Sequence, residues 1–450
     1  MSDQGGLERA RQAPPTLAAP PEAPVYRPFA LLAFGAMVLV GAPLGVWLLA
    51  WLHLGAPALP VDWLLLHASV QVFGFFGTLI VGVAHHLLPR FTGRLVVASA
   101  LTPWLAVLLA AGLALRAAAI VPGAAALAPA GALAQGAAFA LFARWVWRAL
   151  DPPPLAPLRR HLTASGAWLG AACALEVVIR LVALADGRPV PDLDAMRAVH
   201  SIALLGGVLG WVSGVLLRAG PMFVSGWHVP RALAVLVPWG PSLAVPLATA
   251  APLAGPVAAI VLARLADLAA LGTMAALAVS AGALRRSGRA LPMLSRSRAE
   301  ARIFRLGVVS ALAGAIGAAA LALGAGTALP HHALADALRH LMTVGFLTSV
   351  VVAMTFRLIP VLEGAPLPWP RLRTVAFAAL LGSVVLRTAQ GLAIYGWPGL
   401  GPAVALSGVL AWIAPAAVAA SLAAVMIRPR PPTAPAAPCS TRGQRPHDGS

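Results

Sequence analysis

Apolar residues occur along the chain in long runs, separated by short stretches that carry most of the charges and many of the prolines and glycines. A run of about 20 apolar residues is long enough to cross the hydrocarbon core of a bilayer as a helix. We count twelve such runs and predict a transmembrane helix from each. They are 29–52, 62–88, 98–120, 126–148, 162–184, 197–219, 232–252, 254–283, 303–327, 335–360, 373–395 and 400–427.

The composition favours the same class of protein. Hydrophobic residues make up 60% of the 450 residues and charged residues 10%, with a mean hydropathy of +0.86. A soluble domain carries about 25% charged residues. We therefore predict an all-α integral membrane protein in which residues 29–427 form a twelve-helix bundle. The flanks, 1–28 and 428–450, are rich in proline and predict disordered cytoplasmic tails, and we expect no signal peptide in the first flank.

Arginines are distributed unevenly over the predicted loops. All 32 basic residues are arginine, and the net charge is +18. With a cytoplasmic N-terminus, only Arg188, Arg197 and Arg339 lie in outer loops and four arginines lie within spans, which leaves 25 on the inner side. Positive residues concentrate in cytoplasmic loops. The pattern predicts a multi-pass protein of the bacterial inner membrane with both termini in the cytoplasm. Contact with the lipid bilayer explains the charge, and nucleic-acid binding is not expected.

The second, sixth and tenth predicted helices share a pattern of residues. Each carries a histidine near its start: His67, His200 or His340. Each then runs through apolar and glycine-rich sequence to a basic residue three positions before a proline. The prolines, at positions 89, 221 and 360, are 132 and 139 residues apart. Because the three helices are four spans apart, the pattern predicts three pseudo-repeats of four helices.

The predicted topology places the three histidines in one layer of the membrane. All three helices run from outside to inside, and each histidine lies three to five residues from the predicted start. At 1.5 Å per residue this is about 5–8 Å below the outer boundary. A histidine within a span can hydrogen-bond across helices, or it can bind a metal or haem. The repeat favours the second interpretation for His67 and His340 and leaves both open for His200.

Glycines follow each of these histidines and admit two interpretations. They allow either a flat macrocycle or a neighbouring helix to approach closely, and the sequence alone does not distinguish the two. At the inner end of the second span, His85 and His86 lie about 27 Å deeper than His67, so they cannot share a ligand with it. We expect these two to contact lipid headgroups or line a polar entrance.

Four arginines are predicted within spans: Arg116, Arg180, Arg264 and Arg387. Arg180 lies four residues after Glu176, and Arg264 three residues before Asp267, so each can be neutralised locally. Arg116 is expected to extend towards the membrane surface. Arg387 has only Gln390 nearby in sequence, and we expect it to bind an anionic group such as a haem propionate.

Two adjacent histidines, His331 and His332, precede the tenth span in a predicted outer loop. Such a pair can bind copper or zinc or remain solvated, so a second metal site is an open possibility. The chain has no C-x-x-C-H sequence, which excludes a covalently attached c-type haem.

The sequence resembles a known family in its motifs. Histidines on spans 2, 6 and 10 of a twelve-span bundle resemble haem–copper oxidase subunit I. The motifs are more similar to the NnrS family, haem- and copper-containing membrane proteins associated with the bacterial response to nitric oxide. The resemblance rests on YRPF (Tyr26–Phe29), on LHA and FGF within 66–75, and on the two later repeats.

The resemblance implies a cofactor and its ligands. His67 and His340 would be the axial ligands of a b-type haem. His200 would match a copper ligand, with His331 and His332 as candidate partners. The chain departs from the NnrS pattern W-H-A-H-E, because Ser69 replaces the second histidine and Val70 the glutamate. Span 7 has no histidine and Leu204 stands where the oxidases have tyrosine, so a proton-pumping oxygen reductase is not expected.

Three classes of function remain open at this point. The first is a haem-binding protein of the NnrS type, linked to nitric-oxide metabolism or stress. The second is an electron-transfer protein or a reductase of nitric oxide or oxygen, supplied by a membrane electron donor. The third is a repeat-built transporter of small molecules, in which the histidines only hold helices together.

Overall fold

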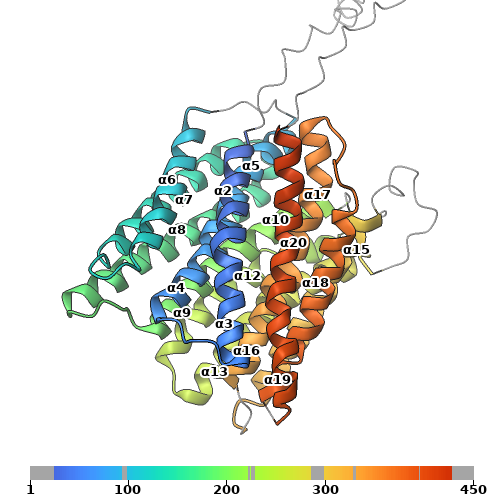
Figure 1. The fold of residues 1–450 in the computed structure, drawn as a ribbon. Helices are drawn as coiled ribbons and strands as arrows, with labels where there is room; N and C mark the ends of the chain where they lie inside the picture. The colour runs from blue at the N-terminus through green and yellow to red at the C-terminus, as the bar shows by residue number, and fades with distance from the viewer. Residues whose placement is uncertain are drawn as a thin grey trace, which may run out of the picture.

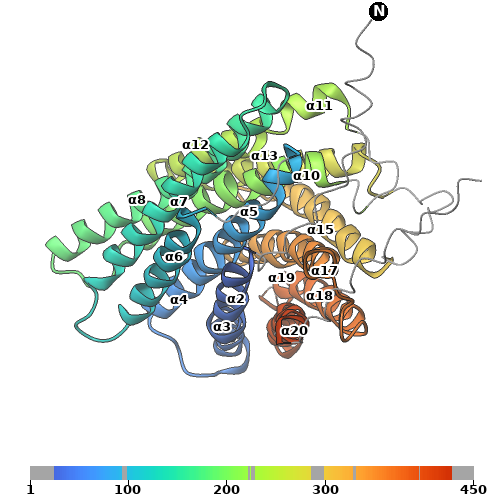
Figure 2. The same cartoon turned by 90° about the horizontal axis from the view of Figure 1, so that it is seen from above.

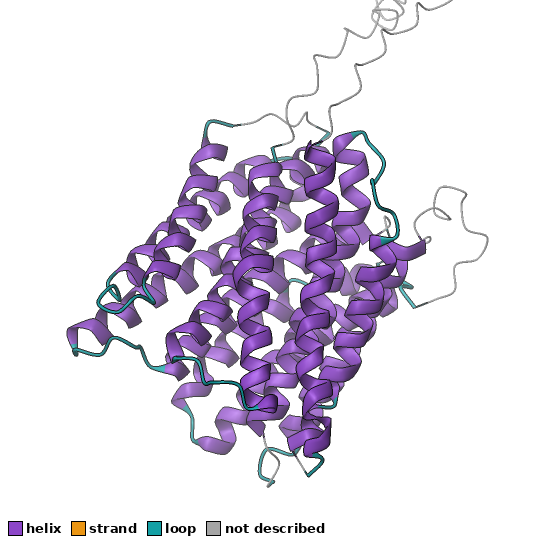
Figure 3. Cartoon of the chain, viewed as in Figure 1, coloured by secondary structure: helices purple, strands orange, loops and turns teal. Residues whose placement is uncertain are grey.

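The computed structural model describes residues 25–93, 99–220, 223, 229–284, 298–327, 331–394 and 396–427; the side chains of residues 331 and 332 lie outside this part. The described residues form helices joined by short connections and contain no strand (Figure 1, Figure 3). The prediction of an all-α fold is therefore confirmed. The predicted tails, 1–28 and 428–450, lie almost wholly outside the described residues.

The helix boundaries follow the predicted apolar runs within a few residues. Gly55 ends α3 with φ +72° and Gly364 ends α17 with φ +62°, a left-handed conformation that glycine adopts without steric cost. The helices are α2 (Arg27–Ala36), α3 (Ala42–Leu54), α4 (Val61–Ser69), α5 (Thr78–Phe91), α6 (Leu101–Ala118), α7 (Leu127–Ala149), α8 (Ala156–Ala185), α9 (Leu193–Ser201), α10 (Gly210–Ala219), α11 (Arg231–Leu236), α12 (Trp239–Ala250), α13 (Pro256–Ser280), α15 (Arg298–Leu323), α16 (His331–His340), α17 (Ser349–Glu363), α18 (Leu372–Thr388), α19 (Gln390–Ile394) and α20 (Gly401–Ile427).

Several of these helices continue one another through π-helical segments. η1 (Met37–Gly41) joins α2 to α3, and η2 (Val70–Gly77) joins α4 to α5. In the same way η4 (Ile202–Leu209) joins α9 to α10, and η7 (Leu341–Thr348) joins α16 to α17. His331 and His332, predicted in a loop, are instead the first two residues of α16.

Eleven helical stretches in the described residues are long and apolar enough to cross a membrane. The chain is therefore a multi-pass membrane protein. The predicted span 126–148 forms α7, a helix of 23 residues that is not among the eleven. Its Gln135, Arg144 and Arg148 lower its hydropathy. The number twelve stays a prediction, as does the division into three four-helix units.

The three histidine-bearing stretches form the interior of the bundle. In the most hydrophobic part of each, 78% (Val61–Phe91), 83% (Leu193–Ala219) and 61% (Ala333–Glu363) of residues are buried, whereas the other eight stretches range from 28% to 50%. Figure 2 shows α5 and α10 in the middle of the bundle. A helix with polar residues in a membrane is stabilised by facing other helices rather than lipid, so this placement fits their histidines.

Glycines let these inner helices approach their neighbours closely. A Cβ added to Gly206 would lie 2.5 Å from Val245 Cγ2, and one added to Gly82 would lie 2.5 Å from the Cβ of Phe29. The other glycines that follow the three histidines also meet side chains of adjacent helices. Of the two interpretations left open by the sequence, helix packing is the one that the structure supports.

The histidine-bearing ends of α4, α9 and α16 all lie toward the same end of the bundle, the lower end in Figure 1. The described chain begins with α2 and ends with α20 at the opposite, upper end. Both ends of the described chain therefore lie on one side of the bundle.

Candidate functional site

A widened helical turn follows each of the three histidines. η2, η4 and η7 are eight residues long and begin three, two and one residues after His67, His200 and His340. A π-helical turn has poorer hydrogen-bond geometry than an α-helical turn and occurs mostly at functional sites. The three helices therefore share a local distortion beside the histidine, which the sequence pattern did not reveal.

His67 is held by a backbone carbonyl of the first span. Its Nδ1 lies 2.8 Å from the carbonyl oxygen of Gly41. Since a carbonyl can only accept, Nδ1 carries the proton and Nε2 carries the lone pair. Gly45, one turn further along, packs against the ring: an added Cβ would lie 2.8 Å from His67 Cε1. A histidine that donates one ring N–H to a carbonyl presents its other nitrogen in a fixed direction, as metal-ligating histidines do.

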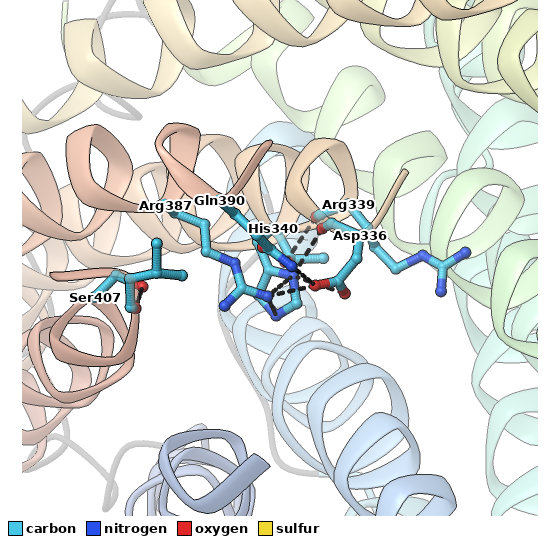
Figure 4. Close-up of polar contacts among 8 residues, drawn as sticks. Asp336, Arg339, His340, Arg387, Gln390 and Ser407 are labelled. Atoms are coloured by element: carbon cyan, nitrogen blue, oxygen red, sulfur yellow. Dashed lines mark hydrogen bonds and ion pairs between the residues drawn. The ribbon is translucent and has the colours of Figure 1, made fainter. Parts of the chain in front are cut away.

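His340 belongs to a polar cluster at the start of the tenth span. Its Nδ1 lies 2.9 Å from the carbonyl oxygen of Asp336, which can only accept, and 3.1 Å from Arg387 Nη2, which can only donate. Arg387 Nη2 donates to Asp336 Oδ2 at 2.6 Å, and Gln390 Nε2 donates to the same oxygen at 3.1 Å. Figure 4 shows Arg387 lying beside His340 and Asp336, while Arg339 points away from them.

Arg387 thus has a carboxylate partner that its sequence neighbours do not provide. Asp336 lies 51 residues away in sequence but belongs to the adjacent helix. The guanidinium also approaches His340 Nε2 to 3.5 Å, and its Nε and Nη1 are buried without a hydrogen-bond partner. Arg387 therefore retains two buried donors, although its charge is balanced by Asp336.

His67 contacts α3, and His340 shares a pocket with a residue of the same helix. Gly45 contacts the ring of His67. Leu49, four residues later and so on the same face of the helix, lines a pocket together with His340, Arg387 and Ser407. The structure therefore brings both predicted haem ligands, and the predicted propionate partner, to one side of the first span.

His200 belongs to a separate, buried cluster. Its Nε2 lies 3.2 Å from Ser69 Oγ, on the neighbouring second span. Arg116 donates to Glu176 Oε1 at 2.5 Å and to Gln135 Oε1 at 2.7 Å, and its Nη1 lies 3.4 Å from Ser69 Oγ. Only 4% of Arg116 is exposed. The expectation that Arg116 extends towards the membrane surface is therefore wrong, because a carboxylate and an amide of neighbouring helices bind it inside the bundle.

The two local ion pairs predicted within spans are confirmed. Arg180 Nε lies 2.7 Å from Glu176 Oε1, and Arg264 Nη1 lies 3.1 Å from Asp267 Oδ2. The first pair is not self-contained, since Glu176 also binds Arg116. The second joins neighbouring turns of α13.

The YRPF motif contacts the end of α17, at the end of the bundle opposite to the three histidines. Tyr26 Oη donates to Glu363 Oε1 at 2.6 Å, and Arg27 Nε donates to the same oxygen at 3.0 Å. This joins the first span to the end of α17.

His85 is buried and stacks on Trp145 with ring centroids 4.0 Å apart, and His86 is buried too. The expectation that these two histidines contact lipid headgroups is therefore wrong, because both are buried inside the bundle, and the alternative of a polar entrance stays a prediction.

No three histidine, cysteine, aspartate or glutamate side chains gather around a common metal position within the described part of the chain. The side chains of His331 and His332 lie outside that part. The predicted second metal site, with His200, His331 and His332, therefore stays a prediction.

The model of one protein family, described as NnrS protein, matches residues 23–430. The chain belongs to the NnrS family. The matched range contains every described residue, including both polar clusters and the YRPF motif. No curated protein matches the chain.

One departure of this NnrS-family chain from the family pattern gains a structural meaning. Ser69, which stands where the pattern has a second histidine, is the residue that contacts His200. The hydroxyl thus joins the second and sixth spans. A histidine at this position would place a second imidazole near His200. In this chain a serine hydroxyl makes the polar contact between the two spans instead.

The sequence alone did not predict several residues of the polar clusters in this NnrS-family protein. Asp336 precedes His340 by one helical turn, a spacing that could have identified it. Gly41, Gly45 and Gln135 have no comparable signal, because their roles depend on contacts between helices that are distant in sequence.

Proposed function

We propose that this NnrS-family membrane protein binds a b-type haem with His67 and His340 as axial ligands. The observation that carries the proposal is the state of the two rings. Each ring has its Nδ1 within 2.9 Å of a backbone carbonyl oxygen, and in the tautomer that donates to this carbonyl, Nε2 is the ring acceptor. That arrangement orients a histidine for metal binding, and two such rings on one side of α3 suit the two faces of a planar macrocycle.

The surrounding residues fit an anionic, flat cofactor. Arg387 lies next to His340, and its buried Nε and Nη1 have no hydrogen-bond partner. A haem propionate could accept hydrogen bonds from both nitrogens. Gly45 packs against the His67 ring and so restricts its orientation. When bound, haem would supply a redox-active iron, and the family resemblance suggests a role in nitric-oxide metabolism or stress. The residues of this chain would orient the two ligands and donate hydrogen bonds to the propionate carboxylates.

An absorption spectrum of the purified full-length protein tests the proposal directly. A bis-histidine iron is low-spin, so a sharp α band is expected on reduction. Purified protein that contains no haem would contradict the proposal and favour the transporter interpretation. Turnover of nitric oxide or oxygen with an electron donor, measured on the same preparation, separates a reductase from a haem-binding protein.

Replacing Gly45 by alanine is expected to lower haem affinity. The added Cβ would lie 2.8 Å from His67 Cε1, so the ring must shift from its present direction. Loss of the correct ligand orientation commonly weakens metal binding about 10–100-fold. Haem titration of the apoprotein measures the change. Gly35→Ala on α2 is the control, since its added Cβ meets nothing within 4 Å. An equal loss in both variants would contradict a role for Gly45 beside His67.

We further propose twelve transmembrane helices with both termini in the cytoplasm of a bacterial inner membrane. The eleven candidate stretches and α7 together make twelve, an even number. An even number of crossings agrees with both ends of the described chain lying on one side of the bundle (Figure 1). The arginine distribution favours the cytoplasm for that side.

Cysteine labelling on either side of α7 is expected to distinguish eleven spans from twelve. Pro122 and Pro154 are exposed, one before and one after this helix. In a variant whose Cys439 is replaced by serine, Pro122→Cys should react with a membrane-impermeant maleimide from outside the cell. Pro154→Cys should react only after permeabilisation. Labelling of both from the same side would mean that α7 does not cross.

A further inference from the structure

The cluster around His200 carries more positive than negative charge. Arg116 and Arg180 both donate to one oxygen, Glu176 Oε1, at 2.5 and 2.7 Å. The exposed fractions of the Arg116, Arg180 and Glu176 side chains are 2%, 11% and 0%. Two guanidinium groups and one carboxylate leave one excess positive charge within the membrane-spanning part of the protein. Such a charge is costly there unless a counter-ion neutralises it.

Two buried donors of the same cluster lack an acceptor. Arg116 Nη2 and Gln135 Nε2 have no hydrogen-bond partner, and Gln135 is completely buried. Glu176 Oε2 is also without a partner. Water could satisfy these hydrogen bonds, but water would not neutralise the charge. A negatively charged acceptor would accept hydrogen bonds from the two donors and would also neutralise the excess charge.

A pocket leads to this cluster from the end of the bundle where the three histidines lie. Arg116, Arg180 and Ser69 line it, together with residues of the connection between α6 and α7 and Pro189. Asp62, which also lines the pocket, is half-exposed and forms no ion pair with the residues that the structure describes. Asp62 therefore binds neither guanidinium directly and leaves the donors of the cluster without an acceptor.

We propose that this pocket binds a small monovalent anion, such as chloride or nitrate, between Arg116, Arg180 and Ser69. One negative charge balances the excess charge of the cluster, and Asp62 disfavours a second one by repulsion. The anion would lie next to His200, because Ser69 Oγ is 3.2 Å from His200 Nε2. The site is independent of the proposed haem, whose ligands belong to the other polar cluster.

Calorimetric titration tests the anion site. Purified full-length protein in gluconate buffer is titrated with chloride or nitrate at constant ionic strength. One saturable site per chain is expected. Arg180→Gln should weaken binding about tenfold or more, since it removes a hydrogen bond from a charged donor. Ser69→Ala, which removes a neutral partner and preserves the arginines, should weaken binding less.

Arg264→Gln is the matched control. Arg264 is also an intramembrane arginine, with 10% of its side chain exposed, but it is balanced by Asp267 alone. This variant should bind the anion as the unmodified protein does. Absence of saturable binding in the unmodified protein, or equal weakening by Arg180→Gln and Arg264→Gln, would overturn the proposal. Binding retained in a His67→Ala, His340→Ala variant would support a site separate from the haem, and its loss there would contradict that separation.

Discussion

Replacing His67 and His340 together by alanine is expected to abolish the low-spin haem spectrum of the purified protein. The two Nε2 atoms are the proposed axial ligands, and alanine offers no lone pair in their place. Each single replacement should also remove the low-spin α band, because six-coordinate iron then loses one strong ligand. The measurement is the reduced-minus-oxidised absorption spectrum, with haem content per chain determined on the same sample.

Two other histidine variants control this experiment. His161 is buried and its Nε2 lies 2.9 Å from Ser213 Oγ. His161→Ala therefore removes a buried, hydrogen-bonded imidazole from a spanning helix without touching the proposed ligands, and the α band should persist. His200→Ala should likewise retain it, since this ring contacts Ser69 in the other cluster. An unchanged low-spin spectrum in the double variant would remove the ligand assignment.

Replacing Glu176 by alanine is expected to destabilise the protein strongly. The carboxylate binds Arg116 and Arg180 and is completely buried, so its removal leaves two guanidinium groups without a counter-charge. Breaking a buried ion pair by removing one partner costs about 3–5 kcal/mol. Because membrane proteins often unfold irreversibly, the measurement is the thermal midpoint in detergent at a fixed scan rate.

The control for this prediction is an exposed ion pair of the same chain. Asp186 and Arg188 lie 2.7 Å apart, and 53% of each side chain is exposed. Asp186→Ala should change the free energy of unfolding by at most about 1 kcal/mol, since water already solvates both charges. If Glu176→Ala and Asp186→Ala lower the midpoint equally, the ion pair in the bundle is not needed for stability.

The two polar clusters illustrate what local sequence can predict about a membrane site. Glu176–Arg180 and Arg264–Asp267 were predictable because residues three or four apart meet on one helix face. Arg116 was misjudged because its partners, Gln135 and Glu176, lie on two other helices. Arg387 and Asp336 were not paired for the same reason.

The three histidines show the same division at a larger scale. Their spacing and the pattern they share predicted that they occupy related places, and the shared π-helical segments and buried helices agree with this. The pattern did not predict that His200 contacts Ser69, while His67 contacts α3 and His340 shares a pocket with Leu49 of α3. Three equivalent sequence positions therefore belong to two different clusters.

The sequence by itself determined the class of the protein and the position of its helices, and it supplied the candidate cofactor ligands that remain predictions. This follows because the bilayer requires long apolar helices, whose length and ends depend on local composition. Only the tertiary structure decided which helices are central, which polar groups pair and which charge remains unbalanced. Those properties depend on contacts between helices far apart in sequence, such as Tyr26 with Glu363 and Arg116 with Glu176, and no local pattern encodes which helix lies next to which.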